Sequence, residues 1–105
     1  MKILHTADWH LGRSLRGVSL LEDHAHILNQ VFETIVSRDI EVLIVAGDIY
    51  DKTSPPEAAV KLYSDFIERV YEETEAAIVV IAGNHDSGQR LGAVTKLFDK
   101  KRILI

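Results

Sequence analysis

Three short apolar runs alternate along the chain with two longer amphipathic stretches. The runs cover residues 2–7, 42–46 and 78–82, and each is followed by glycine or by turn-forming polar residues. A short, nearly continuous apolar run is typical of a buried strand in a parallel sheet. The β-branched run at 42–46 indicates a strand covered on both faces.

Two stretches between these runs have the apolar spacing of amphipathic helices. They cover residues 21–38 and, after a capping-box pattern at 54–57 with Ser54 as the expected N-cap, the residues up to about 73. The expected inward side chains are Leu28, Val31, Phe32, Ile35 and Val36 in the first helix and Ala59, Leu62, Tyr63, Phe66, Ile67 and Val70 in the second.

The remaining segments complete an alternating order of strands and helices. Residues 11–20 contain two glycines and no clean period, so we expect a loop there. A shorter helix is expected at 91–98, and a fourth strand begins at about residue 102. Such alternation predicts an α/β fold with right-handed βαβ crossovers and a parallel sheet. Ligands bind to open sheets of this class at the carboxyl ends of the strands.

Polar residues with the chemistry of metal ligands follow each of the three main apolar runs. Asp8 and His10 follow the first, Asp48 the second, and Asn84 with His85 the third. Carboxylate, imidazole and amide groups without thiolate suit manganese, iron, zinc or magnesium. If Asp48 lies between the other two motifs, its carboxylate can bridge two cations about 3.5–4 Å apart, an arrangement that holds a phosphate for in-line attack.

Each of these residues also has a purely structural interpretation. Asp8 and Asp48 can cap helices or turns, Asn84 can occupy a left-handed turn, and His85 can be an ordinary loop histidine. For any one residue taken alone the structural interpretation is favoured, because a motif needs structural context before it counts. The ordered set at equivalent strand ends favours a metal site. Gly47, before Asp48, allows the backbone to turn sharply there.

Four further polar residues lie close in sequence to the first motif. Arg13 and Arg16 are either solvated loop residues or contacts to phosphate, and solvation is the favoured interpretation. His24 and His26 lie two apart in the first helix, so they point in different directions and do not share one metal. Surface or outer roles are expected for both histidines.

Composition narrows the class of protein without deciding its partners. The chain has 105 residues, 47% of them hydrophobic, which fits one folded domain. A net charge of −4 argues against a broad basic surface, and the absence of cysteine excludes disulfides and thiolate metal sites. No apolar run approaches the roughly 20 residues of a membrane span, and no signal-peptide pattern is present. A cytoplasmic protein is the default expectation.

The order D-x-H, G-D and G-N-H-D resembles the calcineurin-like metallophosphoesterases. The longer strings LHTADWHLG at 4–12 and VAGDIYD at 45–51 resemble the SbcD-like DNA nuclease subunits of that superfamily. The resemblance implies that Asp8, His10 and Asp48 bind one metal ion. It implies that Asp48 and Asn84 bind a second ion, and that His85 assists at the scissile phosphate.

The same resemblance implies a fold, a cofactor and partners. These nucleases use two divalent metal ions, with manganese expected here. They act on DNA as exonucleases and hairpin endonucleases in recombination and repair, with an SbcC-like ATPase and as a homodimer within that complex. Their catalytic domain is a four-layer αββα sandwich with further histidine ligands in its second half. Since no histidine follows His85, residues 1–105 correspond to the amino-terminal part of that domain.

Two alternatives remain at this stage. A phosphomonoesterase or cyclic-nucleotide phosphodiesterase of the same superfamily shares every metal motif and differs in the substrate groove. A fragment that folds or associates without turnover is the alternative from a different functional class.

Overall fold

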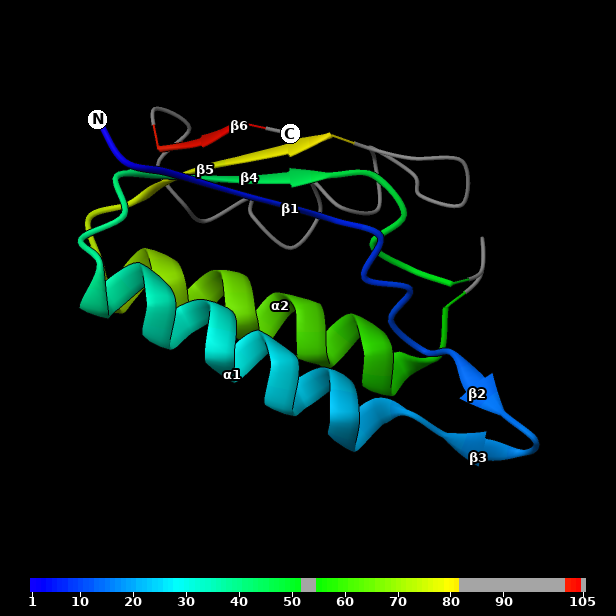
Figure 1. Cartoon of the computed structure of the whole chain (residues 1–105). Coiled ribbons are helices and arrows are strands. Elements are labelled where there is room, and N and C mark those ends of the chain that lie inside the picture. The colour runs from blue at the N-terminus through cyan, green and yellow to red at the C-terminus, as the bar shows by residue number, and fades with distance from the viewer. Residues whose placement is uncertain (52–54, 82–101, 105) are drawn as a thin grey trace.

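A parallel sheet of four strands carries both long helices on one of its faces (Figure 1). The computed structural model describes residues 1–51, 55–81 and 102–104. The strands in spatial order are β1 (Ile3–Ala7), β4 (Val42–Ala46), β5 (Ala77–Ile81) and β6 (Ile103–Leu104), and the helices are α1 (Leu21–Ser37) and α2 (Glu57–Glu73). All strand pairs are parallel, so the predicted α/β class and parallel sheet are confirmed.

The core lies between this sheet and the two helices. Leu4, Leu43, Ile78 and Ile103 lie in register across the four strands, and the last three are buried. Because side chains alternate along a strand, Val45 and Val80, two residues further along β4 and β5, point into the same core. The register therefore fixes which side of the sheet receives the helices.

The helical periodicity predicted most of the inward side chains. In α2, Ala59, Tyr63, Phe66, Ile67 and Val70 are buried and Leu62 is partly buried against the core. In α1, Leu28, Phe32 and Ile35 are buried and Val31 packs against them. Val36 is 52% exposed, so its inward placement was wrong. It is the next-to-last residue of α1, one position after the buried Ile35.

Arg69 fastens the two helices to each other from the solvent side. Its guanidinium lies 3.7 Å from the centroid of the Phe32 ring and donates to the Asn29 side-chain oxygen at 2.9 Å. The contact joins the outer edges of α1 and α2 over the buried Phe32.

Two details differ from the sequence prediction. The expected loop at 11–20 contains a small hairpin, β2 (Ser14–Leu15) and β3 (Val18–Ser19), whose two central residues both have positive φ, as a type I′ turn requires. The second helix begins at Glu57, with Pro56 in extended conformation at the N-cap position and no side-chain cap. Ser54, the expected cap, and the expected helix at 91–98 lie outside the described residues.

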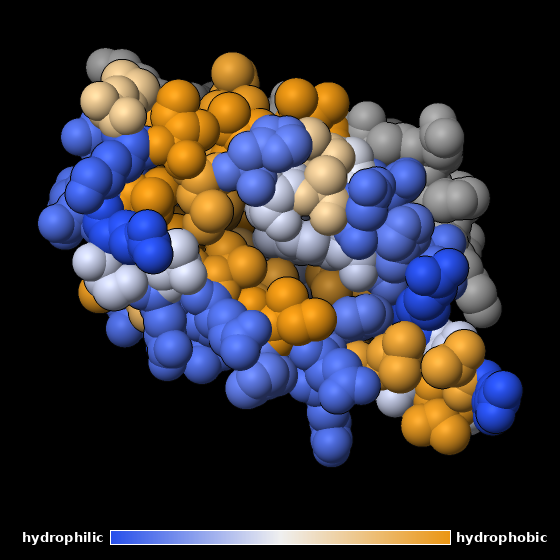
Figure 2. Space-filling view, viewed as in Figure 1, coloured by the Kyte–Doolittle hydropathy of each residue, from blue (hydrophilic) through white to orange (hydrophobic). Residues whose placement is uncertain are grey.

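The sheet is covered by helices on one face only, within the part of the chain that the structure describes. Ile3 and Ile81 are each 54% exposed and Leu104 is 65% exposed, all at positions that alternate with the buried ones. On β4 itself the residues of this face, Val42, Ile44 and Ala46, are half-buried, so the expected cover on both faces of the 42–46 strand stays a prediction. Figure 2 shows hydrophobic side chains gathered over the sheet and hydrophilic ones along the outside of α1.

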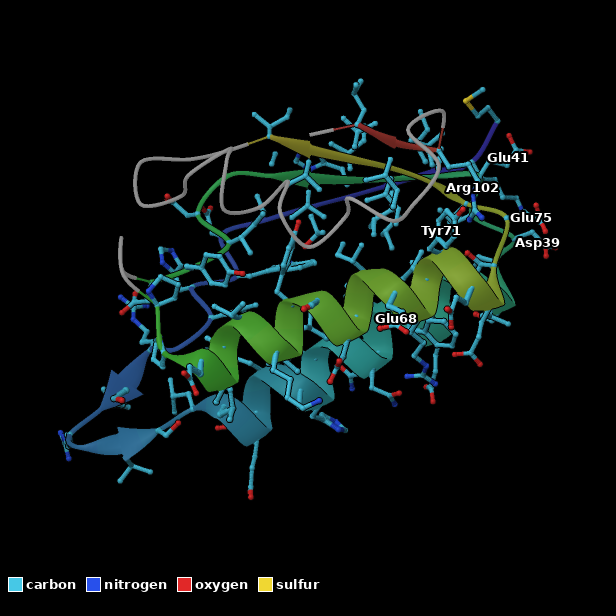
Figure 3. All side chains as sticks on the ribbon, turned by 180° about the vertical axis from the view of Figure 1, so that it is seen from behind. Asp39, Glu41, Glu68, Tyr71, Glu75 and Arg102 are labelled. Carbon is cyan, nitrogen blue, oxygen red and sulfur yellow. The ribbon has the colours of Figure 1, made fainter. Side chains whose placement is uncertain are left out.

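Arg102 joins the start of β6 to the end of α2. Its guanidinium donates to the carbonyl oxygens of Tyr71, Thr74 and Ala76 at 2.8–2.9 Å and lies 4.5 Å from the centroid of the Tyr71 ring. Figure 3 shows this contact at the end of the molecule away from the β2–β3 hairpin, near Glu75.

Candidate metal centre

The loops that follow β1 and β4 lie side by side and continue the hydrogen-bonding pattern of the sheet. Asp8 N donates to Gly47 O at 3.1 Å, and His10 N donates to Asp48 O at 2.9 Å. Leu11 N then donates to Ile49 O, and Asp51 N returns a bond to Leu11 O. The polar residues of the two motifs are thus held by backbone bonds to the neighbouring loop, and their separation does not depend on side-chain contacts.

Three residues of these loops adopt the left-handed backbone conformation. The φ angles are 55° at Asp8, 49° at His10 and 48° at Asp48. This conformation is uncommon for residues other than glycine, although Asp, Asn and His adopt it more often than most. Gly47, with φ of 80°, supplies the turn that was expected before Asp48. Strained backbone of this kind clusters at functional sites.

The three left-handed residues bring their side chains together. One ligand atom from each of Asp8, His10 and Asp48 lies within 4.8 Å of the other two. Asp48 Oδ1 and His10 Nδ1 are buried, and neither has a hydrogen-bond partner among the described residues. A buried carboxylate oxygen without a partner is costly, and a cation bound at Asp48 Oδ1 would remove that cost. The donor set and its geometry fit a divalent metal ion.

Trp9, between two of these residues, points the other way. Its indole Nε1 donates to Thr6 Oγ1 at 2.9 Å, and its ring packs edge-on against Phe66 with centroids 5.4 Å apart. The buried tryptophan anchors the loop in the core, while its sequence neighbours Asp8 and His10 belong to the cluster with Asp48.

A cavity of about 350 Å³ opens beside the cluster, between the loop after β1 and the start of α1. Asp8, His10, Arg13 and His24 supply most of its polar lining. Burial lowers the pKa of His24 below its ordinary 6.5, and the nearby carboxylates of Asp23 and Asp51 only partly oppose this effect. His24 lies in the wall of this cavity, which agrees with an outer role.

Asp51 is the residue of the site to which the sequence assigned no role. Its Oδ1 lies 3.4 Å from His10 Nδ1 and 3.5 Å from Arg13 Nε, and its side chain is 22% exposed. Arg13 is 57% exposed, so the expectation of a solvated loop arginine holds for most of its side chain. The repeated aspartate in the string VAGDIYD was the only available signal for Asp51.

The third motif cannot be placed beside the first two. Asn84 and His85, predicted as a metal ligand and as the residue that assists at the phosphate, lie outside the described residues. The described end of β5, at Ile81, donates no side chain to the cluster but accepts a hydrogen bond from Gly47 N at 2.7 Å. This bond joins the β4 loop to the strand that leads into the third motif.

Comparison with known proteins identifies the family of this fold and cluster. The family model of the calcineurin-like phosphoesterases matches residues 1–103, nearly the whole chain. The chain belongs to this family. Calcineurin-like phosphoesterases use divalent metal ions, in agreement with the cluster of Asp8, His10 and Asp48. The predicted resemblance to this superfamily is confirmed.

One curated relative narrows the comparison within the calcineurin-like phosphoesterases. The chain is 44% identical over its 105 residues to SbcD, the D subunit of the nuclease SbcCD, of Staphylococcus saprophyticus subsp. saprophyticus. The match covers the whole of this chain, and the chain spans 28% of the relative's length. The SbcD-like resemblance drawn from the motifs is therefore confirmed. In the described residues, neither helix is long and apolar enough to cross a membrane.

Proposed function

We propose that this chain contributes the first two metal-binding motifs of an SbcD-like DNA nuclease that hydrolyses phosphodiester bonds with divalent metal ions. The observation that carries the proposal is the cluster of Asp8, His10 and Asp48 with a buried, unpartnered carboxylate oxygen. The printed name of the curated relative, which calls it part of a nuclease, supports DNA as the substrate. Because the chain spans 28% of that relative, the activity belongs to a polypeptide that also carries the remaining segments.

The residues of the proposed site would have different roles. Asp8 and His10 would hold one ion, Asp48 would bridge to a second ion, and Asn84 would complete the bridged pair. Two bound divalent ions would neutralise phosphate charge and activate water at neutral pH, and manganese is the ion we expect. His85 would act on the scissile phosphate and the leaving group, a contribution of roughly 10²–10⁴-fold to the rate.

The assembly that we propose follows from the SbcD-like resemblance. An SbcC-like ATPase would be the partner subunit, and two nuclease subunits would form a homodimer in that complex. The cellular role would be recombination and repair, including cleavage of hairpin ends, in the cytoplasm.

Replacing the bridging carboxylate tests the proposal. The test uses a longer polypeptide that contains this chain and also the segments that complete the relative's length. In that protein, Asp48→Asn should abolish manganese-dependent cleavage of a labelled hairpin DNA, because the loss of one negative charge weakens both ion sites. The rate of DNA cleavage should be compared with the rate of p-nitrophenyl phosphate hydrolysis by the same preparation. Activity on the small ester with none on DNA would favour the phosphomonoesterase alternative.

Asp39→Asn is the matched control. Asp39 also has a left-handed backbone, with φ of 51°. It lies between α1 and β4, at the end of the strands opposite the cluster (Figure 3). The control should retain wild-type cleavage. Wild-type turnover by a folded Asp48→Asn protein would contradict the two-metal mechanism.

A further inference from the structure

Asp51 lies where the outer partner of a metal-binding histidine is expected. His10 Nδ1 is buried and faces Asp51 Oδ1 at 3.4 Å. This distance is slightly longer than the roughly 2.7–3.2 Å of a well-formed hydrogen bond, and the two side chains must reorient to form one. Histidines that bind metals commonly donate their second ring N–H to a carboxylate, which fixes the tautomer and the orientation of the ring.

The position of Asp51 is itself fixed by the backbone and by Arg13. Asp51 N donates to Leu11 O at 3.0 Å, which ties the β4 loop to the residue directly after His10. Arg13 Nε approaches the same carboxylate oxygen at 3.5 Å from the other side, while Arg13 N donates to His10 O at 3.2 Å. The carboxylate is therefore held beside the imidazole by contacts that do not involve the metal ligands Asp8 and Asp48.

We propose that Asp51 is a positioning residue of the metal centre: its carboxylate accepts a hydrogen bond from Nδ1–H of His10 and so presents Nε2 of that ring to a divalent ion. Arg13 holds the carboxylate in place from the solvent side. The inference rests on the proposed metal-dependent function, which assigns His10 as a ligand. It adds a residue that the three motifs of the site do not include.

The tautomer of His10 tests this role without any metal. In the metal-free protein, long-range ¹H–¹⁵N correlation spectra show which ring nitrogen carries the proton, read at a pH at which the shifts show a neutral ring. The wild type should be protonated at Nδ1. Asp51→Ala should shift the population toward protonation at Nε2, whereas Asp51→Asn keeps an acceptor oxygen and should retain Nδ1 protonation.

Manganese affinity is the second readout, followed by the loss of the electron paramagnetic resonance signal of free Mn²⁺. Asp51→Ala should weaken binding by about 10- to 100-fold, the usual cost of removing an outer partner of a metal ligand. Asp51→Asn should lose less than Asp51→Ala. Asp39→Ala removes the same charge at the far edge of the sheet and should change neither readout.

The outcomes separate the positioning role from the metal centre itself. An unchanged tautomer in folded Asp51→Ala protein would overturn the positioning role, and so would equal losses of affinity in the alanine and asparagine variants, which would leave only a charge effect. Wild-type manganese binding that Asp48→Asn does not weaken would instead contradict the proposed centre. Because the tautomer is read without metal, it decides the role of Asp51 in either case.

Discussion

Gly12 is a point of close approach between the loop after β1 and the start of α2. Its φ is +93°, and a Cβ atom there would lie 3.0 Å from Pro56 Cδ and 3.3 Å from Ala59 Cβ. The proline ring and the buried alanine have little freedom to move. A side chain at this position would therefore push the loop after β1 away from the start of α2.

Gly12→Ala should lower the free energy of unfolding by about 2–4 kcal/mol, from overpacking together with a left-handed backbone that alanine disfavours. Gly17→Ala is the control, since Gly17 has φ of +79° and a Cβ atom there would meet no other atom within 4 Å. It should cost only about 1–2 kcal/mol of backbone strain. Urea unfolding of both variants measures the difference. Equal losses in the free energy of unfolding would show that the close contact with α2 does not contribute to the destabilisation.

His24 should make the stability of the metal-free protein depend on pH. Burial lowers the pKa of His24 in the folded state below 6.5, whereas the unfolded chain keeps the ordinary value. As the pH falls through about 6.5, the unfolded chain binds the proton first, so the free energy of unfolding declines until the lower folded pKa is passed. Thermal unfolding at pH 7.5 and pH 5 should show a larger loss for the wild type than for His24→Asn. The same loss in both proteins would exclude His24 as a source.

The sequence contained enough information to bring Asp8, His10 and Asp48 together but not to place the residues around them. Asp8, His10 and Asp48 could be predicted because parallel strands in register bring their carboxyl ends to one edge. The approach of His24 and Asp51 depends on how α1 enters from the hairpin and on the bond between Asp51 N and Leu11 O. Neither follows from periodicity.

At the scale of elements, Arg102 links the start of β6 to the end of α2. The helix ends in acidic residues with no basic residue in its last turn, so Arg102 supplies the positive charge and the donors that the final carbonyls lack.

Arg102→Ala should therefore lower the free energy of unfolding by roughly 2–3 kcal/mol, because it removes charge-assisted bonds from a partly buried position. Arg69→Ala is the matched control, as it loses an arginine that lies over an aromatic ring but is bonded at the exposed surface. It should cost about 1 kcal/mol. Amide exchange at Ile103 and Leu104 should accelerate in Arg102→Ala alone; unchanged protection of β6 would contradict the attachment.

The long elements were predictable and the short ones were not. Helical periodicity over 17 residues identifies α1 and α2 with little ambiguity. The hairpin strands have 2 residues each, too few to show a period. Their turn needs a positive φ at Arg16, a conformation that an arginine in the sequence does not indicate. The capping pattern misplaced the start of α2 because Pro56 remains extended.

At the scale of the whole molecule, the second face of the sheet determines how the isolated chain behaves. The exposed side chains Ile3, Ile81 and Leu104 make this face apolar, beside partly buried neighbours on β4 and β5. Apolar patches of this kind mark association surfaces.

We expect the isolated chain to self-associate through this face. Light scattering after size exclusion should give a mass above 11.8 kDa, and combined Ile81→Lys and Leu104→Lys substitutions should reduce it toward that value. Val36→Lys, at an exposed apolar residue of α1, should leave the association unchanged. A monodisperse wild-type monomer would contradict the role of the sheet face.

The left-handed backbone at Asp8, His10 and Asp48 lowers stability at the residues to which the metal chemistry is assigned in the proposed function. Glycine adopts this conformation without the steric cost that His10 bears, so replacing His10 with glycine would relax the loop while removing a proposed ligand. A library of variants ranked by melting temperature alone would then enrich the sequences that have lost the site. Engineering a more robust version of this chain therefore requires positions 8, 10 and 48 to be held constant while the rest of the sequence is varied.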